Sequence, residues 1–450
     1  MIGLNQELLE RRQEQMPVRV GMVGAGQMGI DVVAEVTQMK GIDIVAIADI
    51  DISRAESAYE IAGTETIPVK VSSVSQADQL VAAGKRIYAD DYRVITNMKE
   101  IDVMLEATGV PDVGAKAALL SAGTGQQLAM MNVETDITVG PLLNWYAQKK
   151  GVLYALAAGD EPAACKELYD FADSLGFTIV AAGKGKNNPL DRHAKPTDQT
   201  WAKEAVRRGL NPNMLVEFVD GSKTMIEMAA VSNATGLIPD VRGMHGPKTS
   251  RDKLNETFAL KEHGGVLNQM GVVDYGIGGV HPGVFLVVTT DHPRLRQALV
   301  YRDMGDGPYY TLFRPYHLCS IEVPLTCAML VIRKKSNMTP LNKLVSEVFA
   351  VAKQDHSPGH VLDGIGGCDF YGLIDHYATA QKEKLVPIGL AKGAKVVRPV
   401  AEDAPVTYDD VQLNENSAVF KLRQLQDSWM AGRIDERELL GLVDGIAQEQ

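Results

Sequence analysis

The chain has little of what marks a secreted, membrane-spanning or disulfide-stabilised protein. Its four cysteines in 450 residues include no CxxC pair, so neither a disulfide framework nor a zinc knuckle is indicated. No apolar run approaches the roughly 20 residues needed to span a bilayer, and the longest lies near 284–288. The first fifteen residues are polar and lack the apolar centre of a signal peptide. We therefore expect a cytoplasmic protein with reduced thiols and no membrane partner.

An excess of basic residues is also absent. The formal net charge is −12, which argues against a nucleic-acid partner because phosphate binding needs a basic surface. A composition of 45% hydrophobic and 23% charged residues is that of an ordinary globular protein. Since single cores stop growing near roughly 300 residues, we expect two or three domains.

The first 158 residues alternate between short apolar segments and helical patterns. Such alternation predicts a parallel sheet with helices on both faces, a doubly wound α/β fold of the Rossmann type. The stretch 62–100 fits this pattern poorly and is interpreted as an insertion at the sheet edge. The predicted strands are 17–23, 43–48, 101–108, 126–131 and 151–158, and helices are predicted over 27–39 and from about residues 111 and 138.

Beyond the first domain the pattern changes twice. Residues 159–382 mix strands, helices and Gly/Pro-rich loops, which predicts an α+β domain for substrate binding, catalysis and dimerisation. Residues 383–450 begin with short strands separated by Pro and Gly turns and end in a polar helix. We expect a small β-rich C-terminal domain there.

A glycine-rich motif follows the first predicted strand and opens the next helix. In "VGMVGAGQMG", Gly24 suits a tight turn, Gly26 a close approach of a pyrophosphate, and Gly29 close helix packing. Asp49 ends the next strand and could accept hydrogen bonds from a ribose, which favours NAD, whereas nearby Arg54 could meet a 2′-phosphate, which favours NADP. The predicted turn also contains Ala25, Gln27 and Met28.

Two further loops should lie at the same edge of the sheet, because ligands of such sheets bind outside the carboxyl ends of the strands. The segments are "EATG", with Ala107, Thr108 and Gly109, and "MNVETD", with Asn132 and Glu134. Either could line the cofactor cleft or simply form a turn that caps the next helix.

Cations gather between residues 184 and 195. "GKGKNNPLDRHAK" reads as a Gly/Pro/Asn loop, and in an acidic chain such a concentration suits a phosphate or carboxylate, although a solvated surface loop is an equal alternative. Arg314 and His317, in "LFRPYHLC", could contact substrate or form a paired structural cluster. The predicted cations are Lys184, Lys186, Arg192, His193 and Lys195, with Lys223 as a further candidate.

Two adjacent acids, Asp160 and Glu161, follow the last apolar segment of the first domain. Buried carboxylates need a partner, which could be a divalent ion, a lysine or substrate hydroxyls. Glu227, in a helical stretch rich in small residues, is a third candidate acid. The alternative is that Asp160 or Glu161 only favours the N-terminus of the next helix.

From residue 17 to about 380, through "VGMVGAGQMG", "DVMLEATG" and "MNVETD", the chain resembles the homoserine-dehydrogenase-like NAD(P) oxidoreductases. Its tail, "PIGLAKGAKVVRPVAEDAPVTYDDV", resembles a SAF domain. Among proteins of this build, the chain looks most like the 1-deoxy-D-xylulose 5-phosphate reductoisomerase-like family.

The resemblance implies a homodimer that uses NADPH to convert 1-deoxy-D-xylulose 5-phosphate to 2-C-methyl-D-erythritol 4-phosphate, an isoprenoid precursor. It also implies Mg²⁺ or Mn²⁺ held by Asp160, Glu161 and Glu227. Lys184 or Lys186 would move a proton, and the other cations would hold the phosphorylated substrate. Two alternatives remain open: a dehydrogenase of homoserine or of a tetritol or sugar phosphate, and a non-catalytic sensor of the NAD(P) redox state.

Overall fold

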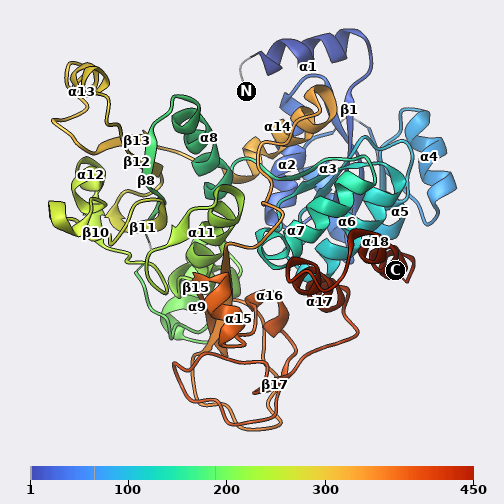
Figure 1. The fold of residues 1–450 in the computed structure, drawn as a ribbon. Helices are drawn as coiled ribbons and strands as arrows, with labels where there is room; N and C mark the ends of the chain where they lie inside the picture. The colour runs from blue at the N-terminus through green and yellow to red at the C-terminus, as the bar shows by residue number, and fades with distance from the viewer. Residues whose placement is uncertain (1–2, 65, 188, 450) are drawn as a thin grey trace. The chain divides into compact units, whose positions relative to one another are not determined.

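The computed structural model describes residues 3–64, 66–187 and 189–449, and it falls into two compact units (Figure 1). Unit 1 contains the chain up to residue 163 together with 318–342 and the part from 416 onward. Unit 2 contains 164–317 and 343–415. Both units are therefore built from separate stretches of sequence. The sequence predicts instead three domains in series, and their boundaries at 158/159 and 382/383 remain predictions.

Unit 1 is built on a seven-stranded parallel sheet in the order β3-β4-β2-β1-β5-β6-β7. The order turns back at β1, which confirms the predicted doubly wound fold. The elements are α1 (Leu4–Gln13), β1 (Val18–Val23), α2 (Gln27–Gln38), β2 (Ile42–Ala48), α3 (Ile52–Ile61), β3 (Val69–Lys70), α4 (Val74–Ala82), β4 (Ile87–Ala89), α5 (Tyr92–Thr96), β5 (Val103–Glu106), α6 (Pro111–Thr124), β6 (Gln127–Met130), α7 (Val133–Lys149) and β7 (Tyr154–Leu156).

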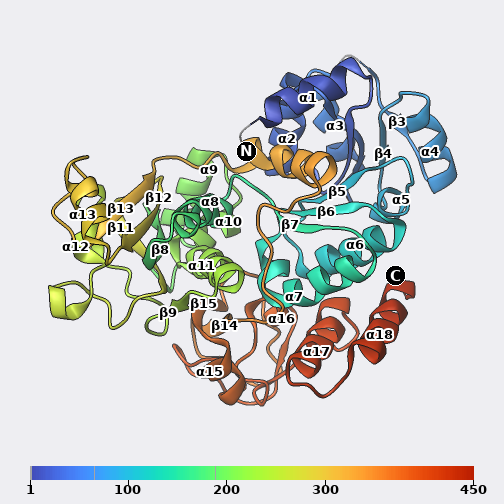
Figure 2. The same cartoon turned by 45° about the horizontal axis from the view of Figure 1, so that its top comes forward.

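Helices cover both faces of this sheet. Helices α2 and α3 pack together on one face and α6 and α7 on the other, as Figure 2 shows. Strands β3 and β4 extend the sheet at its edge, in the stretch that the sequence interprets as an insertion. Helix α7 begins at Val133, five residues before the predicted start, because the Asn132 side chain caps it by accepting the Thr135 N–H at 3.0 Å.

Segments distant in sequence complete unit 1. Val323 and Cys327, from the segment after residue 317, join the core formed by β1, β2 and α2. Helix α17 packs on α6 and α7, where the Gln426 side chain bonds both the Leu142 N–H and the Thr138 carbonyl. These elements are η3 (Cys319–Glu322), α14 (Val323–Ala328), η4 (Met329–Arg333), α17 (Ala418–Met430) and α18 (Glu436–Gln448).

Unit 2 contains a mixed sheet in the order β10-β11-β8-β12-β13, with β9 beside β11, and a separate antiparallel pair, β14-β15. Helix α11 packs on β11, β14 and β15. The elements are α8 (Glu161–Ser174), which begins in unit 1, β8 (Thr178–Lys186), α9 (Gln199–Arg208), α10 (Pro212–Val219), α11 (Ser222–Thr235), β9 (Ile238–Pro239), β10 (Lys248–Ser250), η1 (Arg251–Lys253), α12 (Leu254–Thr257), η2 (Lys261–His263), β11 (Val272–Gly279), β12 (Val284–Thr289), α13 (Pro293–Val300), β13 (Tyr310–Arg314), β14 (Ser346–Ala352), β15 (Phe370–His376), α15 (Tyr377–Lys382), α16 (Ile388–Ala391), β16 (Lys395–Val396) and β17 (Val411–Gln412).

Short strands and isolated bridges dominate residues 384–412, as the Pro/Gly turns predict. The pair β16-β17 is antiparallel, and single bridges join 349 to 387, 351 to 405, 356 to 400 and 361 to 395. Within the described part of the chain, no helix combines the length and apolar character needed to cross a membrane.

Candidate functional site

The glycine motif forms a tight turn between β1 and α2, and its three glycines differ in what surrounds them. Gly24 has φ +100°, and a Cβ there would lie 2.7 Å from the Ala107 carbonyl carbon. A Cβ on Gly29 would lie 2.6 Å from the Gly24 oxygen. Around Gly26, by contrast, no heavy atom of the described residues other than Gly26 and its two chain neighbours lies within 4 Å of such a Cβ. The turn therefore leaves open space only where a pyrophosphate would approach the backbone, so these residues fit a dinucleotide.

Asp49 lies directly after β2 and is tied to this turn. Its carboxylate accepts hydrogen bonds from the Ala25 N–H at 2.7 Å and the Asp51 N–H at 2.9 Å. Arg54 is exposed and pairs with Asp51 at 3.3 Å. An acid held beside the glycine turn suits recognition of a ribose, while the Arg54 side chain stays accessible to a 2′-phosphate.

The sequence predicts that the segment beginning with Glu106 lines the cofactor cleft but assigns no role to this acid, which is the last residue of β5. It is fully buried, and its Oε1 accepts hydrogen bonds from the N–H and the hydroxyl of Thr108. Burial, only partly offset by these bonds, raises the pKa of Glu106 to about 7. The signal that could have found it is an acid ending an otherwise apolar strand at the ligand edge of the sheet. Glu106 holds the predicted Thr108–Gly109 turn in place.

Lys184 and Lys186 lie on strand β8, not on a loop, so the loop interpretation of their segment is wrong for these two residues. β8 lies between β11 and β12, and both lysine side chains are buried. Strand residues two apart share a face of the sheet, which brings both ammonium groups to the same side. Apolar packing on a central strand outweighed the turn propensity of the alternating glycines.

Lys184 forms an ion pair with Glu227 of helix α11, and their side chains are 8% and 1% exposed. The structure thus supplies a lysine as a cationic partner for this acid. Lys186 donates to the Phe218 carbonyl at the end of α10. Burial and then the neighbouring Lys184 charge lower the pKa of Lys186 to about 8. The cluster therefore holds an amine that can gain and lose a proton near neutral pH.

The remaining predicted cations contact other parts of unit 2. The Arg192 guanidinium lies 5.7 Å from the Tyr371 ring centroid, and Lys195 donates to the Gln354 side chain at 2.6 Å. His193 lies between Glu402 and Asp403, at 3.2 and 2.9 Å. These three residues follow β8 in the sequence, and their side chains contact residues between 354 and 403. Within the described part of the chain they do not form a single phosphate-binding loop with Lys184 and Lys186.

Lys223 lies one helical turn before Glu227 on α11 and is half-buried. Arg314, at the end of β13, pairs with Glu167 at 3.0 Å and stacks on Tyr316, which agrees with the paired structural alternative for this segment. His317 follows in the loop after β13 and is half-buried.

Asp160 and Glu161 do not end a strand, because β7 stops at Leu156 and Glu161 is the first residue of α8. Gly159, at φ +100°, reverses the chain just before them, and a Cβ there would lie 1.9 Å from the Cys319 carbonyl oxygen. The Gly159 carbonyl also accepts the Cys319 N–H at 2.8 Å. The two acids thus stand at the start of a helix, the position that the helix-terminus alternative describes.

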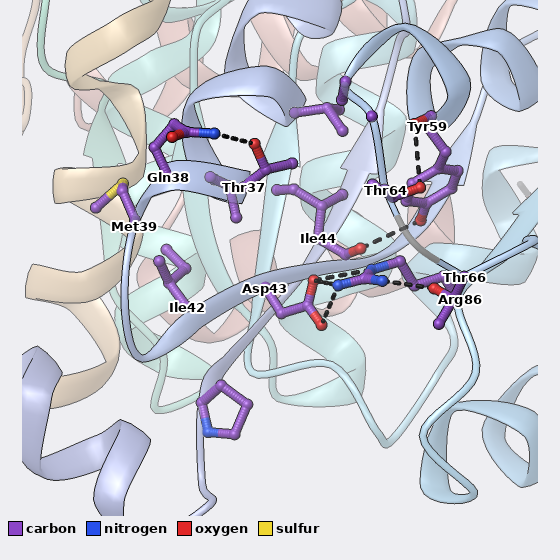
Figure 3. Close-up of a pocket in the computed structure, with 15 residues that line it drawn as sticks. Thr37, Gln38, Met39, Ile42, Asp43, Ile44, Tyr59, Thr64, Thr66 and Arg86 are labelled. Carbon is purple, nitrogen blue, oxygen red and sulfur yellow. Dashed lines mark hydrogen bonds and ion pairs between the residues drawn. The ribbon is translucent and has the colours of Figure 1, made fainter.

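A cavity of about 460 Å³ lies in unit 1 at the beginning of β2 (Figure 3). Arg86 reaches into it and makes two-pronged contacts with Asp43 at 3.0 to 3.2 Å. β2 begins there, so the cavity is at the opposite edge of the sheet from the glycine turn. Its two charged lining groups, Asp43 and Arg86, pair with each other.

Comparisons with known proteins add one family finding. Residues 159–323 match the model of a family described as "Oxidoreductase DRL, catalytic domain". This segment contains Asp160, Glu161, Lys184, Lys186 and Glu227. No curated protein matches the chain.

Solved structures with a similar arrangement include three inositol dehydrogenases. Myo-inositol 2-dehydrogenase from Lactobacillus plantarum is 14% identical, with 71% of this chain and 91% of that chain covered and a TM-score of 0.37. Myo-inositol dehydrogenase from Lactobacillus casei, in complex with NAD(H) and myo-inositol, is 14% identical over 68% and 69%, at 0.32. Scyllo-inositol dehydrogenase from L. casei, with bound NAD(H), is 11% identical over 60% and 73%, at 0.32.

At these scores the likeness carries no argument about substrate. What identifies the class of protein is the glycine turn on a doubly wound sheet together with the catalytic-domain match of residues 159–323. The chain is an NAD(P)H-dependent oxidoreductase.

Proposed function

We propose that this oxidoreductase is a reductoisomerase that converts 1-deoxy-D-xylulose 5-phosphate to 2-C-methyl-D-erythritol 4-phosphate with NADPH. The observation that carries the proposal is the match of residues 159–323 to the oxidoreductase DRL catalytic domain, with two buried lysines and Glu227 inside that segment. Rearrangement of a hydroxyketone needs a group that moves a proton near neutral pH and a charge that stabilises an oxyanion.

The lysine cluster meets both needs. Lys186, with a pKa of about 8, takes the proton from the C3 hydroxyl as the bond between C3 and C4 breaks and the bond between C2 and C4 forms, and it returns the proton to the C2 oxygen. Lys184 pairs with Glu227, and its ammonium group stabilises the developing oxyanion. The resulting aldehyde gains one hydride and one proton. Arg192, His193, Lys195 and Lys223 remain the predicted ligands of the phosphate.

NADPH would supply the hydride when bound. Gly24, Gly26 and Gly29 would hold its pyrophosphate, Asp49 its ribose and Arg54 its 2′-phosphate. The Glu106 carboxyl would keep the Thr108–Gly109 turn in position beside the cofactor.

The divalent metal, Mg²⁺ or Mn²⁺ at Asp160, Glu161 and Glu227, stays part of the proposal. Oxygen ligands of this kind suit hard cations, and a metal would polarise the ketone. Because Glu227 already accepts from Lys184, a metal there would share that carboxylate. If the metal acts in this way, Glu161→Gln should abolish Mg²⁺-dependent stimulation of turnover.

The experiment is to follow NADPH oxidation by the purified chain with 1-deoxy-D-xylulose 5-phosphate or an unphosphorylated pentulose, and NADP⁺ reduction with homoserine. We expect turnover only with the first, and growth of a bacterium lacking its own reductoisomerase when it expresses this chain. Lys186→Met should abolish turnover, while Lys203→Met, an exposed lysine on α9, should not. Turnover with homoserine alone would favour the dehydrogenase alternative, and NADPH binding without any turnover the sensor.

A further inference from the structure

Two histidines and an aspartate cluster in unit 2 outside the lysine site. His356, His360 and Asp369 lie in the connection between β14 and β15. One ring nitrogen of each histidine and one Asp369 carboxylate oxygen all lie within 4.8 Å of one another. The His360 Nε2 is 2.9 Å from the Asp369 Oδ2, and the two imidazole rings stack at 4.8 Å, nearly parallel. Nothing in the proposed reaction uses these residues.

Two of the three groups, His356 and Asp369, are buried, and hydrogen bonds from the surrounding loop orient them. His356 is 4% exposed, and its Nε2 donates to the Asp369 carbonyl at 2.9 Å, which fixes the orientation of the ring. The Asp369 Oδ2 accepts the Asp363 N–H at 2.8 Å, and Gln354 contacts the Oδ1 at 3.4 Å. Metal-binding histidines and carboxylates are typically oriented by such outer hydrogen bonds.

The backbone around the cluster is anchored on both sides. His356 exchanges both backbone hydrogen bonds with Val400, and His360 accepts from the Val396 N–H. Asp363 accepts from the Cys368 and Asp369 N–H groups and so closes the loop between them. The positions of the three side chains therefore follow from a braced loop, although the sequence separates them by up to thirteen positions.

The local charge is negative. Asp363 and Asp369 share the loop, and the buried cation nearby, Lys353, is already paired with Asp220 at 2.8 Å and bonded to the carbonyls of Ala194 and Gly367. A cation at Asp369 would offset this charge. Imidazole nitrogens favour zinc-class ions over Mg²⁺ or Ca²⁺, which take oxygen ligands.

We propose that His356, His360 and Asp369 bind a zinc-class divalent ion, with a fourth position left to water. A tetrahedral site with bonds of about 2.0–2.1 Å needs ligand atoms roughly 3.4 Å apart, so a pair at the 4.8 Å limit would close by about 1.4 Å. The His360 side chain, 40% exposed, makes that movement. The ion joins the start and end of the β14–β15 connection and stabilises the loop. This site is independent of the proposed reaction.

The test is Zn²⁺ binding by the purified full chain, measured by titration calorimetry and by metal content after dialysis. We expect the wild type to retain about one equivalent that excess Mg²⁺ does not displace. His360→Ala, whose side chain is exposed enough to remove without opening the core, should weaken binding at least 100-fold, as should Asp369→Asn. With Co²⁺, the wild type should show the visible absorption of a tetrahedral site, and the His360→Ala protein should not.

Two matched variants separate this site from others. His292→Asn replaces a histidine that caps α13 with another good cap, and Glu161→Gln alters the predicted Mg²⁺ site; both should bind Zn²⁺ as the wild type does. The proposal is overturned if the wild type retains no Zn²⁺, or if His360→Ala binds it equally well while its circular dichroism matches the wild type. Neither result bears on turnover with the sugar phosphate.

Discussion

Replacing Glu227 by glutamine is the sharpest perturbation of the lysine cluster. It removes the Glu227 carboxylate charge that pairs with the Lys184 ammonium, in a site where the two side chains are only 8% and 1% exposed. Removing one member of a buried ion pair typically costs about 3–5 kcal/mol, because the remaining charge stays desolvated. Exchanging both members for apolar groups of similar size is often neutral or stabilising. We therefore expect Glu227→Gln to lower the free energy of unfolding by about 3–5 kcal/mol, and Lys184→Met/Glu227→Leu to lower it far less.

The assay is urea unfolding at pH 7, followed by circular dichroism, of the wild type, Glu227→Gln, and the cycle formed by Lys184→Met, Glu227→Leu and Lys184→Met/Glu227→Leu. Glu204→Gln is the matched control, since Glu204 pairs with Arg207 and Arg208 on the surface, where such pairs contribute little. If the double variant loses the sum of the losses of Lys184→Met and Glu227→Leu, the two groups do not interact, and the stabilising role of the buried pair is refuted.

Three further predictions concern the cofactor turn and Lys186. Gly24→Ala should destabilise unit 1 and abolish NADPH binding, because the φ of +100° and the Ala107 backbone leave no room for a Cβ. Gly26→Ala should fold normally and lose only NADPH binding, measured by fluorescence titration. Equal losses of stability in the two variants would contradict this reasoning. Arg54→Ala should weaken NADPH at least tenfold and leave NADH unchanged; equal effects would exclude a 2′-phosphate contact. Lys186 has a pKa of about 8 when folded against an ordinary 10.5, so the unfolded chain binds more protons between these values and stability rises with pH there. Relative to Lys186→Met, the wild type should gain about 3 kcal/mol between pH 7 and pH 11, and parallel urea midpoints across that range would contradict the burial argument.

Local sequence patterns predicted most of the secondary-structure elements of unit 1. The apolar strands, the glycine turn and the helix opening at Pro111 depend on interactions between near neighbours in sequence, and the structure has them within a few residues of the predicted bounds. The exceptions are informative. Helix α7 begins earlier because a side-chain cap at Asn132 outweighs the apolar periodicity, and the acids at 160 and 161 begin a helix because Gly159 turns the chain against Cys319.

The sequence by itself determined the doubly wound class, the dinucleotide turn and the candidate identities of the functional lysines and acids, since strand and helix periodicity and glycine geometry are local properties. Tertiary structure alone decided that Lys184 and Lys186 lie on a buried central strand, that Lys184 pairs with Glu227 from α11, and that two histidines meet an aspartate of the β14–β15 connection. Burial and charge pairing depend on which distant segments pack together, and residue spacing along the chain does not contain that information.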